Sequence, residues 1–166
     1  IMNISDKGIE QIKKFEGEKL TIYKDTAGIY TVGVGHAIQP KGNESKEQAL
    51  KAFKIKYNLD CNTISKKLCD ELLKDDLRKC ESCITKYVTV PLKQYQFDML
   101  VSFVFNVGES AFKNSTLLKY LNKGDILKAK DQLLLWNKVT VNGKKIVDKG
   151  LANRREKEYE IFTLGY

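Results

Sequence analysis

The chain has 166 residues, of which 42% are hydrophobic, and it contains only 2 prolines and 11 glycines. This composition is typical of a globular domain, excludes collagen-like and disordered chains, and at this length allows a substantial core to be buried. Because 29 Lys and Arg residues exceed 21 Asp and Glu residues, the net charge is +8, which favours an anionic partner.

The first part of the chain predicts one helix and a small sheet. Residues 5–15 carry apolar side chains at helical spacing, behind a serine that fits an N-cap. Short β-branched and aromatic runs at residues 20–23 and 29–36 predict two strands, joined by a glycine-containing turn at residues 25–28. Residues 37–39 allow a third short strand, so we expect either a β-hairpin or a three-stranded sheet.

From residue 45 onward the pattern is helical almost to the end of the chain. The expected helices cover residues 45–57, 65–83, 92–107, 115–121, 125–136 and 150–162. Pro91 is expected at the start of its helix, where a missing N–H does little harm. Residues 139–149, which include Asn142-Gly143, predict a loop or a small hairpin.

This order of elements predicts an α+β fold in a single domain of residues 1–166. We expect a small N-terminal lobe at about residues 1–64, which holds the first helix and the sheet. A long connecting helix follows at residues 65–83, and a larger helical lobe occupies residues 84–166. A cleft between the two lobes is the expected ligand site, since ligands favour such junctions.

The positive charge comes mostly from lysines spread along the whole chain. Because a nucleic-acid binder more often clusters Lys and Arg in one stripe with interleaved aromatics, we expect no nucleic acid as a functional partner. The sequence has no apolar run of 18 residues, so we expect no stable membrane insertion, and we expect a monomer. The sequence leaves open whether a segment before Ile1-Met2 was removed.

All four cysteines, Cys61, Cys69, Cys80 and Cys83, lie within 23 residues. Cys69 and Cys80 would be roughly 16 Å apart along the expected helix, which is beyond the reach of a disulfide. The sequence therefore allows two local disulfides, Cys61 with Cys69 and Cys80 with Cys83. It also allows the alternative that all four cysteines are free thiols. A single C-x2-C pair does not fit a zinc site, and we expect neither a metal nor another cofactor.

Three polar residues near the N-terminus form a candidate catalytic set. Glu16 follows Phe15 at the end of the first helix, Asp25 lies where the first strand ends, and Thr31 lies on the second strand. Two positioned carboxyl groups are what the acid/base cleavage of a glycosidic bond requires. A hydroxyl beside them can hold a water molecule.

The spacing E-x8-D-x5-T, followed by G-x-G-H at residues 33–36, resembles the catalytic signature of the phage-type lysozymes, glycoside hydrolase family 24. Later segments are similar to the C-terminal lobe of lambdoid-phage endolysins, in the same order and at suitable intervals. They are residues 102–108, 111–112, 114–118, 121–125, Trp136 and residues 150–156. The resemblance covers nearly the full length of the chain and supports a lysozyme-like fold.

The resemblance implies an endolysin-type muramidase, a bacteriolytic hydrolase that cuts the β-1,4 bond between N-acetylmuramic acid and N-acetylglucosamine in bacterial peptidoglycan. It implies Glu16 as the general acid, Asp25 as a base acting on a water molecule, and Thr31 as the hydroxyl that helps to hold this water. The family is an inverting one. Such an enzyme is made in the bacterial cytoplasm and acts on the wall from the periplasm, after export or release by a route that stays open.

Further residues are expected to support these three, some from their own chemistry and some from the resemblance. Burial behind Phe15 is expected to keep Glu16 protonated, and Arg154 or Arg155 is expected near Glu16, where it would set the pKa of that carboxyl. His36 is interpreted as a structural residue that contacts Asp75 or Asp76. The candidate substrate-binding residues are Ala37, Phe105, Asn106 and Ser115.

Alternative functions stay open. A non-catalytic peptidoglycan-binding module can be built on the same scaffold, because a fold does not imply a function. A lytic transglycosylase would need a single acid, so Asp25 and Thr31 speak against it. A nucleic-acid binder rests on the net charge alone.

Overall fold

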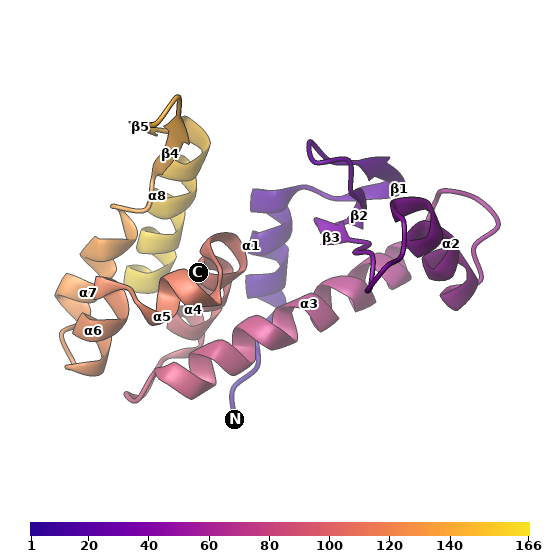
Figure 1. The fold of residues 1–166 in the computed structure, drawn as a ribbon. Coiled ribbons are helices and arrows are strands. Elements are labelled where there is room, and N and C mark those ends of the chain that lie inside the picture. The colour runs from indigo at the N-terminus through magenta and orange to yellow at the C-terminus, as the bar shows by residue number, and fades with distance from the viewer. The chain divides into compact units, whose positions relative to one another are not determined.

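The computed structural model describes residues 1–166, and they form two compact units (Figure 1). One unit comprises Lys13–Asp76, and the other comprises Ile1–Ile12 together with Leu77–Tyr166. The helices α1 (Asp6–Glu16) and α3 (Lys66–Tyr87) each contribute residues to both units. The sequence placed the whole first helix in the N-terminal lobe, whereas its first residues belong to the same unit as the C-terminal helices.

The unit of residues 13–76 contains a three-stranded sheet, one of the two arrangements that the sequence allowed, and it is antiparallel with strand order β1-β2-β3. Its remaining elements are β1 (Lys19–Lys24), β2 (Tyr30–Gly33), β3 (His36–Ala37) and α2 (Lys46–Lys56). The second strand ends earlier than predicted, because Gly33 (φ 72°) and Gly35 (φ 65°) take left-handed conformations and reverse the chain. Gly33 also packs closely on α3: a Cβ there would lie 3.2 Å from Cys69 Sγ.

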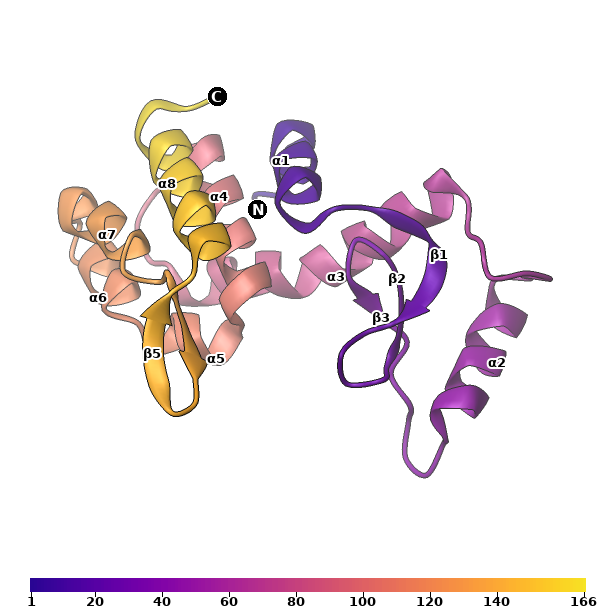
Figure 2. The ribbon, with the colours of Figure 1, turned by 90° about the horizontal axis from the view of Figure 1, so that it is seen from above.

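The other unit is helical apart from one hairpin. Its elements after α3 are α4 (Gln94–Val107), α5 (Glu109–Lys113), α6 (Thr116–Asn122), α7 (Ile126–Leu133), β4 (Lys138–Val141), β5 (Lys144–Val147) and α8 (Lys149–Leu164). Every residue from 97 to 104 is buried, so α4 forms the centre of this unit, with α5 and α8 packed against it (Figure 2). None of the helices combines the length and the apolar character needed to cross a lipid bilayer.

Several helix ends differ from the prediction. Helix α3 continues four residues beyond Cys83, because Ile84, only 1% exposed, extends its apolar stripe by another turn. Helix α4 begins after Pro91 rather than at it, and α7 ends at Leu133 instead of residue 136. The short helix α5 was not predicted.

The segment after α7 is a hairpin rather than a loop. Strands β4 and β5 pair in register from Lys138 with Val147 to Val141 with Lys144. The two turn residues, Asn142 (φ 50°) and Gly143 (φ 78°), both adopt the left-handed conformation that a two-residue hairpin turn requires.

Asp98 is the polar centre of the helical unit and is fully buried. Its Oδ1 accepts hydrogen bonds from Ser5 N at 3.0 Å and from Gln94 Nε2 at 2.8 Å. Its Oδ2 accepts from the Tyr166 hydroxyl at 2.7 Å and from Ser5 Oγ. One carboxylate on α4 therefore holds both the beginning and the end of the chain.

Replacing Asp98 by alanine is expected to lower the free energy of unfolding by about 3 kcal/mol or more, because four donors lose their acceptor inside the protein. Urea unfolding followed by circular dichroism measures this change. The control is Asp131→Ala, an exposed site on α7, which should stay within about 0.5 kcal/mol of the native chain. Equal unfolding midpoints for all three proteins would show that the Asp98 contacts contribute nothing to stability.

Candidate active site

Asp25 lies directly after β1 and is held by the backbone of the turn that follows. Its Oδ1 accepts hydrogen bonds from the N–H groups of Ala27 and Ile29, both at 2.9 Å. Its own N–H donates to Ile29 O at 2.9 Å and closes the turn. The side chain is exposed, so Oδ2 is left to face a ligand.

Thr31 lies on β2 and is almost fully buried, with 5% of its surface exposed. Its hydroxyl donates to Ile29 O at 3.1 Å. A hydroxyl has a single proton, so toward any further partner Thr31 offers only its lone pairs. The strand register pairs Thr31 with Ala37 on β3, which brings this predicted sugar contact beside it.

Ile29 is therefore the link between two of the predicted catalytic residues. Its N–H binds the Asp25 carboxylate, and its C=O accepts from the Thr31 hydroxyl. Both contacts use only the backbone of Ile29. The carboxylate and the hydroxyl are thus fixed to the same short piece of chain.

Glu16 is the last residue of α1 and lies in the same unit as Asp25 and Thr31. Its side chain is exposed and Phe15 is only half-buried, so the burial that the sequence led us to expect at Glu16 is not found. The expected neighbourhood of Glu16 to Arg154 or Arg155 joins residues of different units and stays a prediction, as does a cleft between the lobes.

His36 on β3 contacts the long helix, as predicted. Its Nδ1 lies 2.8 Å from Asp76 Oδ2, and its ring lies 6.0 Å from that of Phe53 between the ring centroids. His36 therefore fixes β3 to α3 and α2, which supports the structural interpretation of this residue.

Arg154 and Arg155 are buried on α8 and connect this helix to α4. Arg154 Nη2 donates to Ser102 O at 3.1 Å and lies 3.3 Å from Ser102 Oγ. Arg155 Nη2 donates to Asn106 Oδ1, and its Nε lies 2.9 Å from Glu158 Oε1. The two arginines thus hold the end of α4 that carries the predicted substrate residues.

The remaining predicted substrate contacts differ in accessibility. Phe105 is half-buried and Asn106 is exposed. Ser115 is 4% exposed, and its hydroxyl accepts from Leu118 N at 3.1 Å and donates to Phe112 O at 2.7 Å, so it serves as the N-cap of α6. Substrate binding by these residues stays a prediction.

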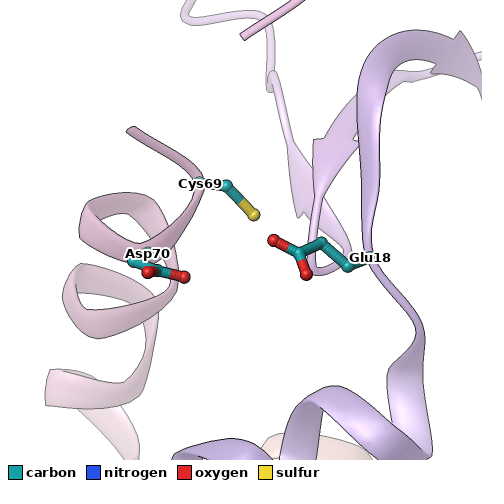
Figure 3. A group of neighbouring side chains, drawn as sticks. All are labelled: Glu18, Cys69 and Asp70. Carbon is teal, nitrogen blue, oxygen red and sulfur yellow. The ribbon is translucent and has the colours of Figure 1, made fainter. Parts of the chain in front are cut away.

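A cluster that sequence reasoning missed joins Glu18, just before β1, to Cys69 and Asp70 near the start of α3. Figure 3 shows the Glu18 carboxylate directed at the Cys69 sulfur. One ligand atom from each of the three residues lies within 4.8 Å of the others, which is compatible in spacing with a metal ion. The residues are far apart in the sequence and match no metal motif, so no sequence pattern signals their contact.

Protein cations already neutralise this cluster. Lys66 Nζ lies 3.1 Å from Glu18, and Lys13 Nζ lies 2.6 Å from Asp70. Burial tends to raise the pKa of Glu18, but hydrogen bonds from Lys66 and Cys69 and the charges of Lys66 and Lys13 outweigh it and lower this pKa. Burial, followed by the contact with Glu18, raises the pKa of the Cys69 thiol to about 11. A protonated thiol between two ion pairs is a poor metal site.

Comparison with known proteins finds similarity to phage lysozymes and endolysins. Residues 13–158 match the model of the family described as phage lysozyme. The endolysin of Salmonella phage P22 is 41% identical over 138 residues, which cover 83% of this chain and 86% of that protein. The endolysin of Bacillus phage B103 is 40% identical over 169 residues, which cover 99% of this chain but only 55% of that protein. The solved structure of an endolysin from Escherichia coli phage FAHEc1 is similar with a TM-score of 0.81 at 34% identity, covering 99% of this chain and 96% of that one.

All four cysteines are free thiols, which confirms one of the two alternatives that the sequence left open. Cys61 is exposed, whereas Cys69, Cys80 and Cys83 are buried along α3. Burial raises the pKa of Cys83, like that of Cys69, to about 11. The local disulfides are not formed.

Thiol titration with an aromatic disulfide reagent at pH 8 should detect one fast-reacting thiol per native chain and four after denaturation, because only Cys61 is exposed to the reagent. Cys61→Ser should abolish the fast phase. Two thiols instead of four in denaturant would reveal a disulfide and contradict the free-thiol state.

Proposed function

The chain belongs to the phage lysozyme family and is a peptidoglycan muramidase, and we propose that Glu16, Asp25 and Thr31 carry out the hydrolysis. The observation that carries this proposal is the joint anchoring of Asp25 and Thr31 on the backbone of Ile29. It turns an exposed carboxylate and a hydroxyl with free lone pairs into one preorganised set. Preorganised groups of this kind are what catalysis requires.

In the proposed reaction the cleaved bond is the β-1,4 linkage between N-acetylmuramic acid and N-acetylglucosamine. Glu16 transfers its proton to the glycosidic oxygen as the bond from that oxygen to the anomeric carbon breaks. A water molecule forms the new bond to this carbon, and Asp25 Oδ2 takes up the proton that the water loses. No metal or other cofactor takes part.

Thr31 determines how that water is held. Its own proton is engaged by Ile29 O, so its oxygen accepts one hydrogen of the water, while Asp25 accepts the other. A lone pair of the water then faces the anomeric carbon. Attack from the side opposite the leaving oxygen gives a product with the α configuration.

The substrate and the charge of the protein are consistent with each other. Peptidoglycan and the polymers around it are anionic, and a net charge of +8 draws the protein toward them. Endolysins act on the cell wall, and we propose that this chain reaches the wall from the periplasmic side as a monomer, with residues 1–166 acting as one lysozyme domain.

The variants Glu16→Gln and Asp25→Asn are each expected to lose at least about 100-fold in hydrolysis, because each removes a proton donor or acceptor from the reaction while preserving shape. The measurement is the loss of turbidity of outer-membrane-permeabilised cells. Glu47→Gln, an exposed change on α2 of the same unit, should remain as active as the native chain. Binding to purified sacculi should be equal in all four proteins.

Two outcomes would contradict this reading. A native chain that binds sacculi without clearing cells would be a non-catalytic wall-binding module. Products that carry only 1,6-anhydromuramic acid, detected by mass spectrometry, would identify a lytic transglycosylase.

Thr31→Val is expected to reduce kcat about 10- to 100-fold and Thr31→Ser to retain most of it, because serine preserves the hydroxyl that accepts from the water. Both variants should fold. The NMR spectrum of the first product formed should show the α anomer. A fully active Thr31→Val enzyme, or a β anomer as the initial product, would contradict the role given to the water.

A further inference from the structure

Arg155 is a cation with no exposed surface, and its contacts within the helical unit are specific. Its Nε lies 2.9 Å from Glu158 Oε1, and its Cζ lies 5.0 Å from the centre of the Phe103 ring. Glu158 is equally inaccessible, so the pair balances its charge inside the protein. Nη2 is directed toward Asn106, which lies at the exposed end of α4.

This contact fixes which way the Asn106 amide points. A guanidinium has five donors and no acceptor, so only the carbonyl oxygen of the amide can face it. The NH2 group of the same amide must then point away from Arg155. No group of the helical unit accepts a hydrogen bond from Asn106 Nδ2. An exposed donor of fixed direction is therefore presented next to Phe105.

We propose that Arg155 is a positioning residue that orients Asn106 so that its side-chain N–H group donates to the acetamido carbonyl of a sugar in the glycan strand. This inference rests on the proposed function and specifies the substrate group that the C-terminal unit recognises. The acetamido carbonyl is a neutral acceptor that recurs on every sugar, which suits a neutral amide donor. Peptidoglycan also carries hydroxyl, ether and stem-peptide carbonyl oxygens and stem-peptide carboxylates as acceptors, but the acetamido carbonyl is the amide acceptor of the glycan strand itself. A carboxylate is more strongly bound by a cation, which Arg155 cannot supply because it is buried against Glu158.

The decisive variant is Asn106→Asp, which keeps an oxygen toward Arg155 and replaces the donor with a second oxygen. Its KM for acetylated peptidoglycan should rise about tenfold, with kcat within about twofold of the native value, because a hydrogen bond to the substrate is lost and two acceptors now meet. On chemically N-deacetylated peptidoglycan, whose sugar amines are cationic, the KM of the variant should no longer exceed the native value. Asn153→Asp, which makes the same charge change at an exposed position of α8, should leave KM unchanged on both substrates.

Three results would overturn the proposal. They are an unchanged KM for Asn106→Asp on acetylated peptidoglycan, an equal penalty on acetylated and deacetylated peptidoglycan, and a penalty that vanishes only on peptidoglycan stripped of its stem peptides. The last result would show that Asn106 donates to a stem-peptide carboxylate instead. Failure of the proposed function is distinguishable, because the native chain would then hydrolyse none of these substrates.

The role of Arg155 itself is tested by Arg155→Lys, since a single ammonium cannot reach both Asn106 and Glu158 with the geometry of a guanidinium. Its KM for acetylated peptidoglycan should rise as in Asn106→Asp. The KM of the double variant should be no higher than that of either single variant. Additive effects would show that Arg155 does not act through Asn106. Thermal melts identify a destabilised Arg155→Lys protein, and in that case the comparison of Asn106→Asp on the two substrates decides the proposal.

Discussion

The helical unit depends on the buried carboxylate of Asp98. Apolar packing is strong but has no direction, and a helix whose residues 97–104 are all buried is free to rotate among similar packings. Asp98 removes this freedom, because its two oxygens must meet Ser5, Gln94 and Tyr166. A charged group in the interior is tolerated only with such a complete set of partners. The orientation of α4 is thereby fixed at its first turns.

The same helix is fixed again at its other end, where the contacts reach a residue proposed to bind the substrate. Arg154 binds Ser102 and Arg155 binds Asn106, so two guanidinium groups hydrogen-bond α8 to α4. Arg155 and Glu158 are both fully buried, and their charges neutralise each other across 2.9 Å. By contrast, the carboxyls of Glu16 and Asp25 are exposed. Interior charges are matched within the protein, whereas the carboxyls proposed for catalysis lie at its surface.

A structural feature can be predicted from the sequence when the interactions that determine it are between residues close together in the chain. The first and last helices were predicted to within two residues at each end, because their apolar spacing is visible in the sequence. The end of α3 was placed too early, although Ile84 continues the helical spacing of Leu77 and Cys80. Helix α5 has five residues, too few to show a period. The neutralised contact of Glu18 with Cys69 was invisible, because it joins segments that only the fold brings together.

The residues proposed for catalysis show a similar division. The resemblance to phage-type lysozymes suggested Glu16, Asp25 and Thr31, but no pattern indicated that Ile29 connects the last two. The connection uses the N–H and C=O of Ile29, which every residue type except proline possesses, so the side chain at this position leaves no signal. What the arrangement requires is the length of the turn from Asp25 to Ile29. The geometry of the proposed water site is therefore encoded in a spacing of residues, and the identity of the linking residue contributes little to it.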